Sequence, residues 1–139
     1  MIIAGFLTSA ISVDKRIEIG ENAPKIETIS GEDVIKDERT DGKMKLISFW
    51  NPKKPESRIT NKSLYQQFGA NSDSQIELIS ICTDPDEALM KEVMKIDGLK
   101  DNNNYSYSQI SSRVFKDYGA DENPKAYMIS AEGKILSIM

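Results

Sequence analysis

Two stretches of the chain are almost continuously apolar, and both have the length of a strand. Lys43–Trp50 (KMKLISFW) and Gln75–Cys82 (QIELISIC) are rich in leucine, isoleucine and aromatic residues. A short run of this kind favours a strand that is covered on both faces of a sheet. Apolar residues recur at helical spacing in three other segments, which predicts helices over Glu56–Ala70, Asp84–Ile96 and Ser108–Tyr118.

Shorter strands are expected towards both ends of the chain. Lys25–Ile29 and Val34–Lys36 flank a turn and are typical of edge strands, whereas Pro124–Ser130 and Lys134–Ile138 predict a hairpin. The predicted order is therefore β, β, β, α, β, α, α, β, β. Helices that cross over between interior strands lie on the faces of a sheet, so this order predicts an α/β fold with a central mixed sheet.

The first two predicted helices carry signals for where they begin and which side is buried. The first follows Pro55, and the second is expected to have Asp84 as its N-cap and Pro85 at its first position. The expected buried stripes contain Ile59, Leu64 and Phe68 in the first helix and Ala88, Leu89, Val93 and Ile96, with Met90 or Met94, in the second.

The composition fits one globular domain and excludes several partners. The 139 residues are 39% hydrophobic and 29% charged, which is enough apolar material for a single core. The formal net charge of −4 is opposite in sign to the surface that nucleic-acid phosphates require, so no nucleic-acid partner is expected. No apolar run approaches the ~20 residues of a bilayer span, so no integral membrane span is expected.

The first residues have the character of an export signal. Met1–Val13 is weakly polar and as long as a signal-peptide apolar region, and Ala10 and Ser12 are spaced like a cleavage site. No lysine or arginine precedes it, so the alternative is an ordinary first strand or helix. We divide the chain into residues 1–16, a signal-peptide remnant or N-terminal extension, and a domain over residues 17–139. The signal interpretation implies export to the periplasm or cell envelope, and the alternative leaves a cytoplasmic location open.

The residue types that are missing exclude several kinds of catalysis and metal binding. Histidine is absent and there is one cysteine, Cys82, which excludes Ser-His-Asp and Cys-His catalysis, histidine-ligated metals, four-cysteine zinc sites and an intramolecular disulfide. Asp84, Asp86 and Glu87 lack the spacing of an EF-hand loop and favour helix capping. No metal and no cofactor are expected. Cys82 ends a predicted interior strand, which favours a small buried residue over a reactive thiol.

Four short motifs occur in one order along residues 19–139. They are Ile19-Gly20-Glu21-Asn22-Ala23-Pro24, Gly42-Lys43 before the strand that ends in Phe49-Trp50, Asn123-Pro124 before Lys125-Ala126-Tyr127-Met128-Ile129, and Glu132-Gly133-Lys134-Ile135. With the predicted order of elements, they resemble the thioredoxin-like superfamily, most closely cell-envelope thiol-disulfide oxidoreductases and peroxiredoxin-like domains. The resemblance implies a three-layer fold with an extra N-terminal β-hairpin.

The same resemblance aligns the family's redox motif with residues that cannot carry out thiol-disulfide exchange. In the family, a Cys-x-x-Cys pair follows the Phe-Trp strand, and its first thiolate attacks a substrate disulfide. Superimposing that pattern on Phe49-Trp50 puts Lys54 and Ser57 at the two cysteine positions, with Pro55 and Glu56 between them. The pair is therefore lost, and no catalytic residue is expected.

The family's remaining feature is a cis proline that faces the redox pair, matched here by Asn123-Pro124. One expectation is that the proline only sets a turn, and the other is that Trp50, Pro55 and the Asn123-Pro124 turn retain a groove for an extended peptide. The leading hypothesis is a redox-inactive module that binds a protein or peptide. The alternative is a thiol-disulfide oxidoreductase or antioxidant enzyme, as the resemblance implies, and a third is a decayed copy with no activity.

A C-terminal helix that the family uses to cover one sheet face has no counterpart in the sequence, which stops at Ile138-Met139. An apolar face left in water forfeits about 25 cal/mol per Å². We therefore expect another element to cover it, either the Met1–Val13 segment or a second subunit of a homodimer.

Overall fold

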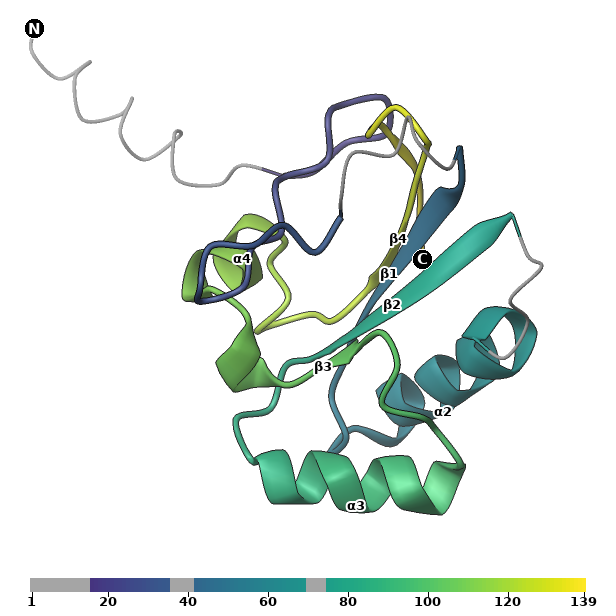
Figure 1. Ribbon diagram of the computed structural model, residues 1–139, viewed down its shortest axis with the longest axis vertical. Helices are drawn as coiled ribbons and strands as arrows, with labels where there is room; N and C mark the ends of the chain where they lie inside the picture. The colour runs from purple at the N-terminus through teal and green to yellow at the C-terminus, as the bar shows by residue number, and fades with distance from the viewer. Residues whose placement is uncertain (1–15, 36–41, 70–74) are drawn as a thin grey trace, which may run out of the picture.

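A mixed five-stranded sheet forms the centre of the molecule (Figure 1). The computed structural model describes residues 16–35, 42–69 and 75–139. The strand order is β3-β2-β1-β4-β5, with β1 parallel to β2, β2 parallel to β3, and β4 antiparallel to both β1 and β5. The strands are β1 Met44–Trp50, β2 Ile76–Cys82, β3 Asn104–Tyr105, β4 Ala126–Ile129 and β5 Ile135–Ile138.

The two interior strands and the C-terminal hairpin are confirmed. β1 and β2 pair in register along their whole length, from Met44 beside Ile76 to Trp50 beside Cys82. β3 is a two-residue strand within a segment that the sequence indicated as a polar loop. It arises because Asn104 and Tyr105 pair with the end of β2, where the sheet edge is open.

Side-chain alternation along the strands divides the core into two layers. Ile47 and Phe49 of β1 face the side of α4 (Ser112–Asp117), where they pack with Val114 and Phe115. Leu46 of β1 faces the opposite side and packs with Leu64 of α2 (Pro55–Leu64). Farther along that side, Trp50 and Cys82 pack against α3 (Glu87–Asp97). Helices on both faces of the sheet make three layers, which confirms the thioredoxin-like α/β architecture.

Helix α2 is shorter than the sequence indicated and is anchored by a polar residue. It continues as a π-helical turn over Tyr65–Gly69, where a Cβ on Gly69 would lie 2.3 Å from a ring carbon of Tyr65. Only a residue without a side chain fits there. Leu64 is buried as expected, but Ile59 is 67% exposed, so its placement in the buried stripe was wrong. The helix is instead rotated so that Asn61 faces the sheet, and Asn61 is 1% exposed.

Helix α3 begins two residues later than predicted. Its N-cap is Asp86, whose side chain accepts a hydrogen bond from the Leu89 N–H at 3.1 Å. Asp84 is not the cap, because its carboxylate accepts from the Asp86 N–H at 2.8 Å and closes the turn before the helix. Met90, Val93 and Met94 form the buried side of the helix. Ala88 and Ile96, which were expected in the buried stripe, are exposed.

The N-terminal segment of the domain lies against α4 and β5. The predicted N-terminal hairpin is present in a reduced form, a single antiparallel bridge between Glu27 and Asp33. Thr28 closes its turn by donating to the Glu32 carbonyl at 2.9 Å, and it also forms a bridge to Ile110. Lys36, the last residue of the predicted second strand, lies outside the described residues.

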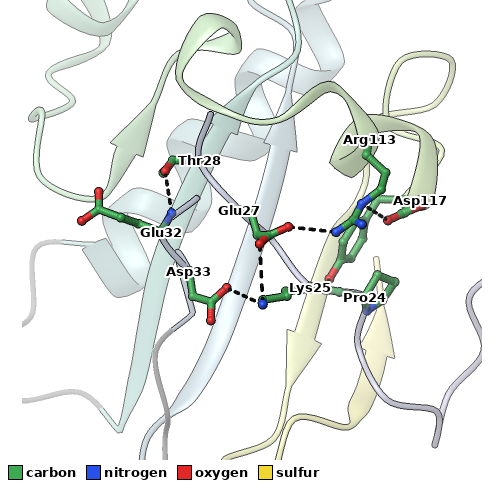
Figure 2. A network of polar contacts seen from close by, with 9 residues as sticks. Pro24, Lys25, Glu27, Thr28, Glu32, Asp33, Arg113 and Asp117 are labelled. Atoms are coloured by element: carbon green, nitrogen blue, oxygen red, sulfur yellow. Dashed lines mark hydrogen bonds and ion pairs between the residues drawn. The ribbon is translucent and has the colours of Figure 1, made fainter. Parts of the chain in front are cut away.

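Ion pairs fasten this segment to α4, as Figure 2 shows. Arg113 of α4 donates to Glu27 at 3.0 Å, and Lys25 lies 3.6 Å from Glu27 and 3.5 Å from Asp33. The Tyr118 hydroxyl donates to the Pro24 carbonyl. The contacts close the sheet face on the α4 side with a segment from the other end of the chain.

Residues 1–13, with the expectations of an export signal or of a covering segment, lie outside the described residues. Among the residues that are described, no helix combines the length and the apolar character needed to cross a bilayer.

Candidate functional site

The start of α2 follows directly from the carboxyl end of β1. Asn51 organises the connection: its side-chain oxygen accepts from the Lys53 N–H at 2.9 Å, and its carbonyl accepts from the Lys54 N–H at 3.1 Å. Lys54 is the N-cap residue, in extended backbone with φ −102° and ψ 114°, and its side chain makes no capping hydrogen bond. Pro55 occupies the first turn, where its missing N–H costs no helical hydrogen bond.

Ser57 is turned back into the connection. Its Oγ accepts a hydrogen bond from the Asn51 N–H at 2.8 Å. The hydroxyl therefore stabilises the loop that leads from β1 into α2. A hydroxyl is no substitute for a thiol in disulfide exchange, because its pKa lies far above that of a thiol and it is a poor leaving group.

The Asn123–Pro124 turn lies across from the start of α2 and leads into β4. The peptide bond before Pro124 is trans, so the cis geometry implied by the resemblance was wrong. The trans isomer is the intrinsically favoured one, by about 0.5–1 kcal/mol, and an Asn-Pro sequence by itself does not specify the other. The Lys125 carbonyl accepts from the Phe49 N–H at 3.0 Å, which ties the turn to β1.

A groove of about 390 Å³ separates the start of α2 from this turn. One wall is formed by residues 53–57 and Thr60, the other by residues 123–126, and the floor by the ends of β1 and of the hairpin. The full lining is Ser48, Phe49, Lys53, Lys54, Pro55, Glu56, Ser57, Thr60, Asn123, Pro124, Lys125, Ala126 and Met139. The structure thus brings together six of the seven residues singled out from the sequence.

The seventh, Trp50, does not reach the groove. Its side chain is 1% exposed and packs with Cys82 and Met90 beneath α3. Strand alternation explains its position: Trp50 ends β1 on the face covered by the helices α2 and α3, where α3 encloses the indole. Its Nε1 is buried and has no hydrogen-bond partner among the residues that the structure describes.

Cys82 is buried, as the sequence indicated. The side chain is 0% exposed at the end of β2, and its Sγ lies 3.6 Å from the Asp84 carbonyl oxygen, to which it donates. Burial raises the pKa of the Cys82 thiol to about 11, with the Asp84 carboxylate adding to the rise. A thiol with this pKa is almost entirely protonated at neutral pH, and the protonated form is not the nucleophile.

Two ion pairs brace the loop and the helix beside the groove. Arg58 donates to both carboxylate oxygens of Asp97 at 2.8 Å, which joins α2 to the end of α3. The Arg58 hydrogen bonds hold the pKa of Asp97 below its usual range. Lys53 lies 3.3 Å from Asp84, so the preceding loop is also tied to the strand end of β2.

Sequence reasoning missed several groove residues, among them Ser48, Thr60 and Lys125. Ser48 alone among them had a usable signal, as a hydroxyl inside a mostly apolar strand. It donates to the side-chain oxygen of Asn61 at 3.0 Å, and Ser80 donates to the same oxygen at 3.2 Å.

Within residues 16–35, 42–69 and 75–139, no three acidic or thiol side chains gather closely enough to hold a metal ion.

No protein-family model and no curated protein matches the sequence. Solved structures do. A thioredoxin-like protein from Parabacteroides distasonis is similar with a TM-score of 0.72 and 25% identity over 88% of each chain. The thioredoxin domain of a thiol-disulfide oxidoreductase from Bacteroides vulgatus gives 0.62 and 21%, again over 88% of each chain. A secreted disulfide oxidoreductase from Mycobacterium tuberculosis gives 0.60 and 21%, over 84% of this chain and 81% of that one.

Proposed function

Because this chain belongs to the thioredoxin-like superfamily, we propose that it is a member without thiol chemistry. It uses the groove between α2 and the Asn123–Pro124 turn to bind an extended segment of a protein or peptide. The observation that carries the proposal is the combination of an open groove with Lys54 and Ser57 on its α2 wall. The family's redox pair would stand at these two positions.

Disulfide exchange needs an accessible thiolate, and the chain offers none in this region. Its single cysteine is buried and has a pKa of about 11. A lone cysteine could at most form a mixed disulfide, with no second thiol to resolve it. The alternative function, a thiol-disulfide oxidoreductase, would require chemistry for which the groove has no residue.

Binding of an extended segment is supported by the form of the groove. Its walls are a helix start and a turn, and its floor contains the strand ends of β1 and β4, so the groove is open to an extended segment that lies between the two walls. We also propose that the protein acts in the periplasm or cell envelope, which is where the signal-like Met1–Val13 would direct it.

Two measurements test the proposal. Reduction of insulin by dithiothreitol is expected to proceed at the protein-free rate with this protein present, and acceleration would overturn the redox-inactive assignment. Separately, NMR titration with an extended peptide is expected to shift the amide signals of Glu56, Ser57 and Lys125.

A pair of matched variants locates the binding. Thr60→Trp fills the groove from the α2 wall and is expected to abolish the shifts. Ile59→Trp places the same bulk on the neighbouring residue, which is 67% exposed and lies outside the groove lining, and is expected to leave them intact. Shifts that are absent around the groove, or that survive Thr60→Trp, would contradict the proposal.

A further inference from the structure

The walls of the groove carry an excess of positive charge. Three lysines, Lys53, Lys54 and Lys125, line it against one acidic side chain, that of Glu56. Lys53 is balanced within the protein, because its ammonium lies 3.3 Å from the Asp84 carboxylate. Among the residues the structure describes, Lys54 and Lys125 have no such ion pair. Both are exposed.

This local charge runs against the charge of the whole molecule. The chain has a formal net charge of −4, so an acidic ligand is repelled by the protein as a whole. A local excess of lysine therefore offsets this repulsion at the groove and favours an acidic ligand there. The two lysines come from opposite walls, Lys54 from the start of α2 and Lys125 from the turn before β4.

The turn also offers main-chain groups to an extended chain. In the described part of the molecule, neither the Lys125 N–H nor the Asn123 carbonyl takes part in a hydrogen bond. A donor and an acceptor two residues apart are what a neighbouring strand uses for pairing. Backbone pairing at the turn would hold a peptide within reach of both lysines.

The Asn123–Pro124 turn has its excess of positive charge on the side that faces α2. A second hollow of about 660 Å³ shares Asn123 and Lys125 with the groove, but there the cations Arg16, Lys116 and Lys125 are matched by Asp117, Asp121 and Glu122. Carboxylates of a ligand therefore meet balanced charge on that side and an excess of lysine on the other. The charges set a direction for the acidic part of the ligand.

We propose that the segment accepted by the groove is acidic, an extended peptide whose aspartate or glutamate side chains pair with Lys54 and Lys125. This inference rests on the proposed function and adds the chemical class of the ligand. Ion pairs at a partly exposed rim contribute specificity and association rate more than raw affinity, so the expected signature is a preference between peptides of equal shape.

The test compares three capped octapeptides of alternating sequence, with valine at every second position and glutamate, glutamine or lysine between. Affinities are measured by NMR titration at low and at moderate salt. The glutamate peptide is expected to bind about tenfold more tightly than the glutamine peptide at low salt, with the ratio falling as salt increases. The lysine peptide is expected to bind most weakly.

Lysine variants assign the preference to the groove. Lys54→Gln combined with Lys125→Gln is expected to equalise the glutamate and glutamine peptides. Lys95→Gln combined with Lys100→Gln removes the same charge from exposed positions outside the groove lining and is expected to preserve the ratio.

The outcomes separate this inference from the proposed function. Equal binding of the glutamate and glutamine peptides in the groove would overturn the acidic preference and leave the binding function standing. A preference that survives the Lys54 and Lys125 changes, or a lysine peptide that binds most tightly, would also overturn the inference alone. Absence of groove shifts with all three peptides would overturn the binding function, and the inference with it.

Discussion

Helices α2 and α3 follow adjacent parallel strands, and they begin in opposite ways. At α3, Asp86 caps the Leu89 N–H, Glu87 stands in the first turn, and Gly98 closes the far end with φ 73°. At α2, Lys54 is the N-cap residue and makes no capping hydrogen bond. An acidic or hydroxyl side chain is favoured at a helix start and a cation is disfavoured, because free N–H groups make that end positive.

The difference indicates which of the two helix N-termini contributes to folding stability. The start of α3 has a capping side chain, whereas the start of α2, where Pro55 and Glu56 suit a first turn, has a cation at the N-cap position beside an open groove. Residues that are locally unfavourable for a helix are expected at functional sites, where contacts elsewhere in the structure compensate for them. The start of α2 is supported from elsewhere, by the Ser57 hydrogen bond, the Arg58–Asp97 pair and the buried Asn61.

The largest expected effect contrasts the thiol of Cys82 with one at the start of α2. With a pKa of about 11, Cys82 is ionised at pH 7 to about one part in 10⁴, compared with about 3% for an ordinary thiol. Lys54→Cys places a thiol at the exposed helix start and is expected to react with a disulfide reagent at least about 100-fold faster than Cys82. Reaction rates at pH 7 measure this, and equally fast labelling of the unmodified protein would refute the buried assignment.

The next effect concerns the anchor of α2. Asn61→Ala leaves the Ser48 and Ser80 hydroxyls buried without their acceptor and is expected to lower the free energy of unfolding by about 2–4 kcal/mol. Urea denaturation measures the change. Lys62→Ala, at the exposed neighbouring residue, is the control and is expected to stay within about 0.5 kcal/mol of the unmodified protein. A similar loss for both variants would show that α2 is not held by Asn61.

Changes at the two helix starts are expected to have opposite signs. Asp86→Ala removes a cap and is expected to cost about 1 kcal/mol. Lys54→Ser supplies a cap and removes the cation, and is expected to add about 0.5–1 kcal/mol while weakening binding of the glutamate peptide. Thermal and urea denaturation of both variants measure this. Destabilisation by Lys54→Ser would mean that the lysine contributes to stability, and the contrast between the two starts would fail.

The smallest effect is the pH dependence of the Arg58–Asp97 pair. Its hydrogen bonds lower the pKa of Asp97 in the folded protein, so the pair stabilises the fold above the unfolded pKa of about 4 and loses this contribution as pH falls through the folded value. Asp97→Asn is expected to lower the Tm near pH 7 by less than Asp86→Ala does. The difference from the unmodified protein should shrink in acid. Asp121→Asn, an exposed control, should show no such trend, and a pH-independent difference for Asp97→Asn would contradict the assignment.

The sequence predicted the positions of the interior strands better than it predicted which faces of the helices are buried. β1 and β2 lie where their apolar runs predicted, because most of their positions are apolar or small and the charged residues Lys45 and Glu77 pair with each other at 2.8 Å. Ile59 and Ile96 show the limit for helices, since both belong to plausible apolar stripes and both are exposed. Which side of a helix meets the sheet depends on where the helix is attached, and for α2 the attachment is polar, through Asn61.

The sequence by itself determined the order of the two interior strands, the helices and the C-terminal hairpin, and the absence of thiols from the start of α2, because these follow from residue identity and local spacing. Only the tertiary structure decided that Pro124 follows a trans bond, that Trp50 lies beneath α3, and that Lys125 faces Lys54 across a groove. These properties join residues far apart in the chain, about 70 positions in the case of the two lysines. They are set by packing between elements, on which local patterns carry no information.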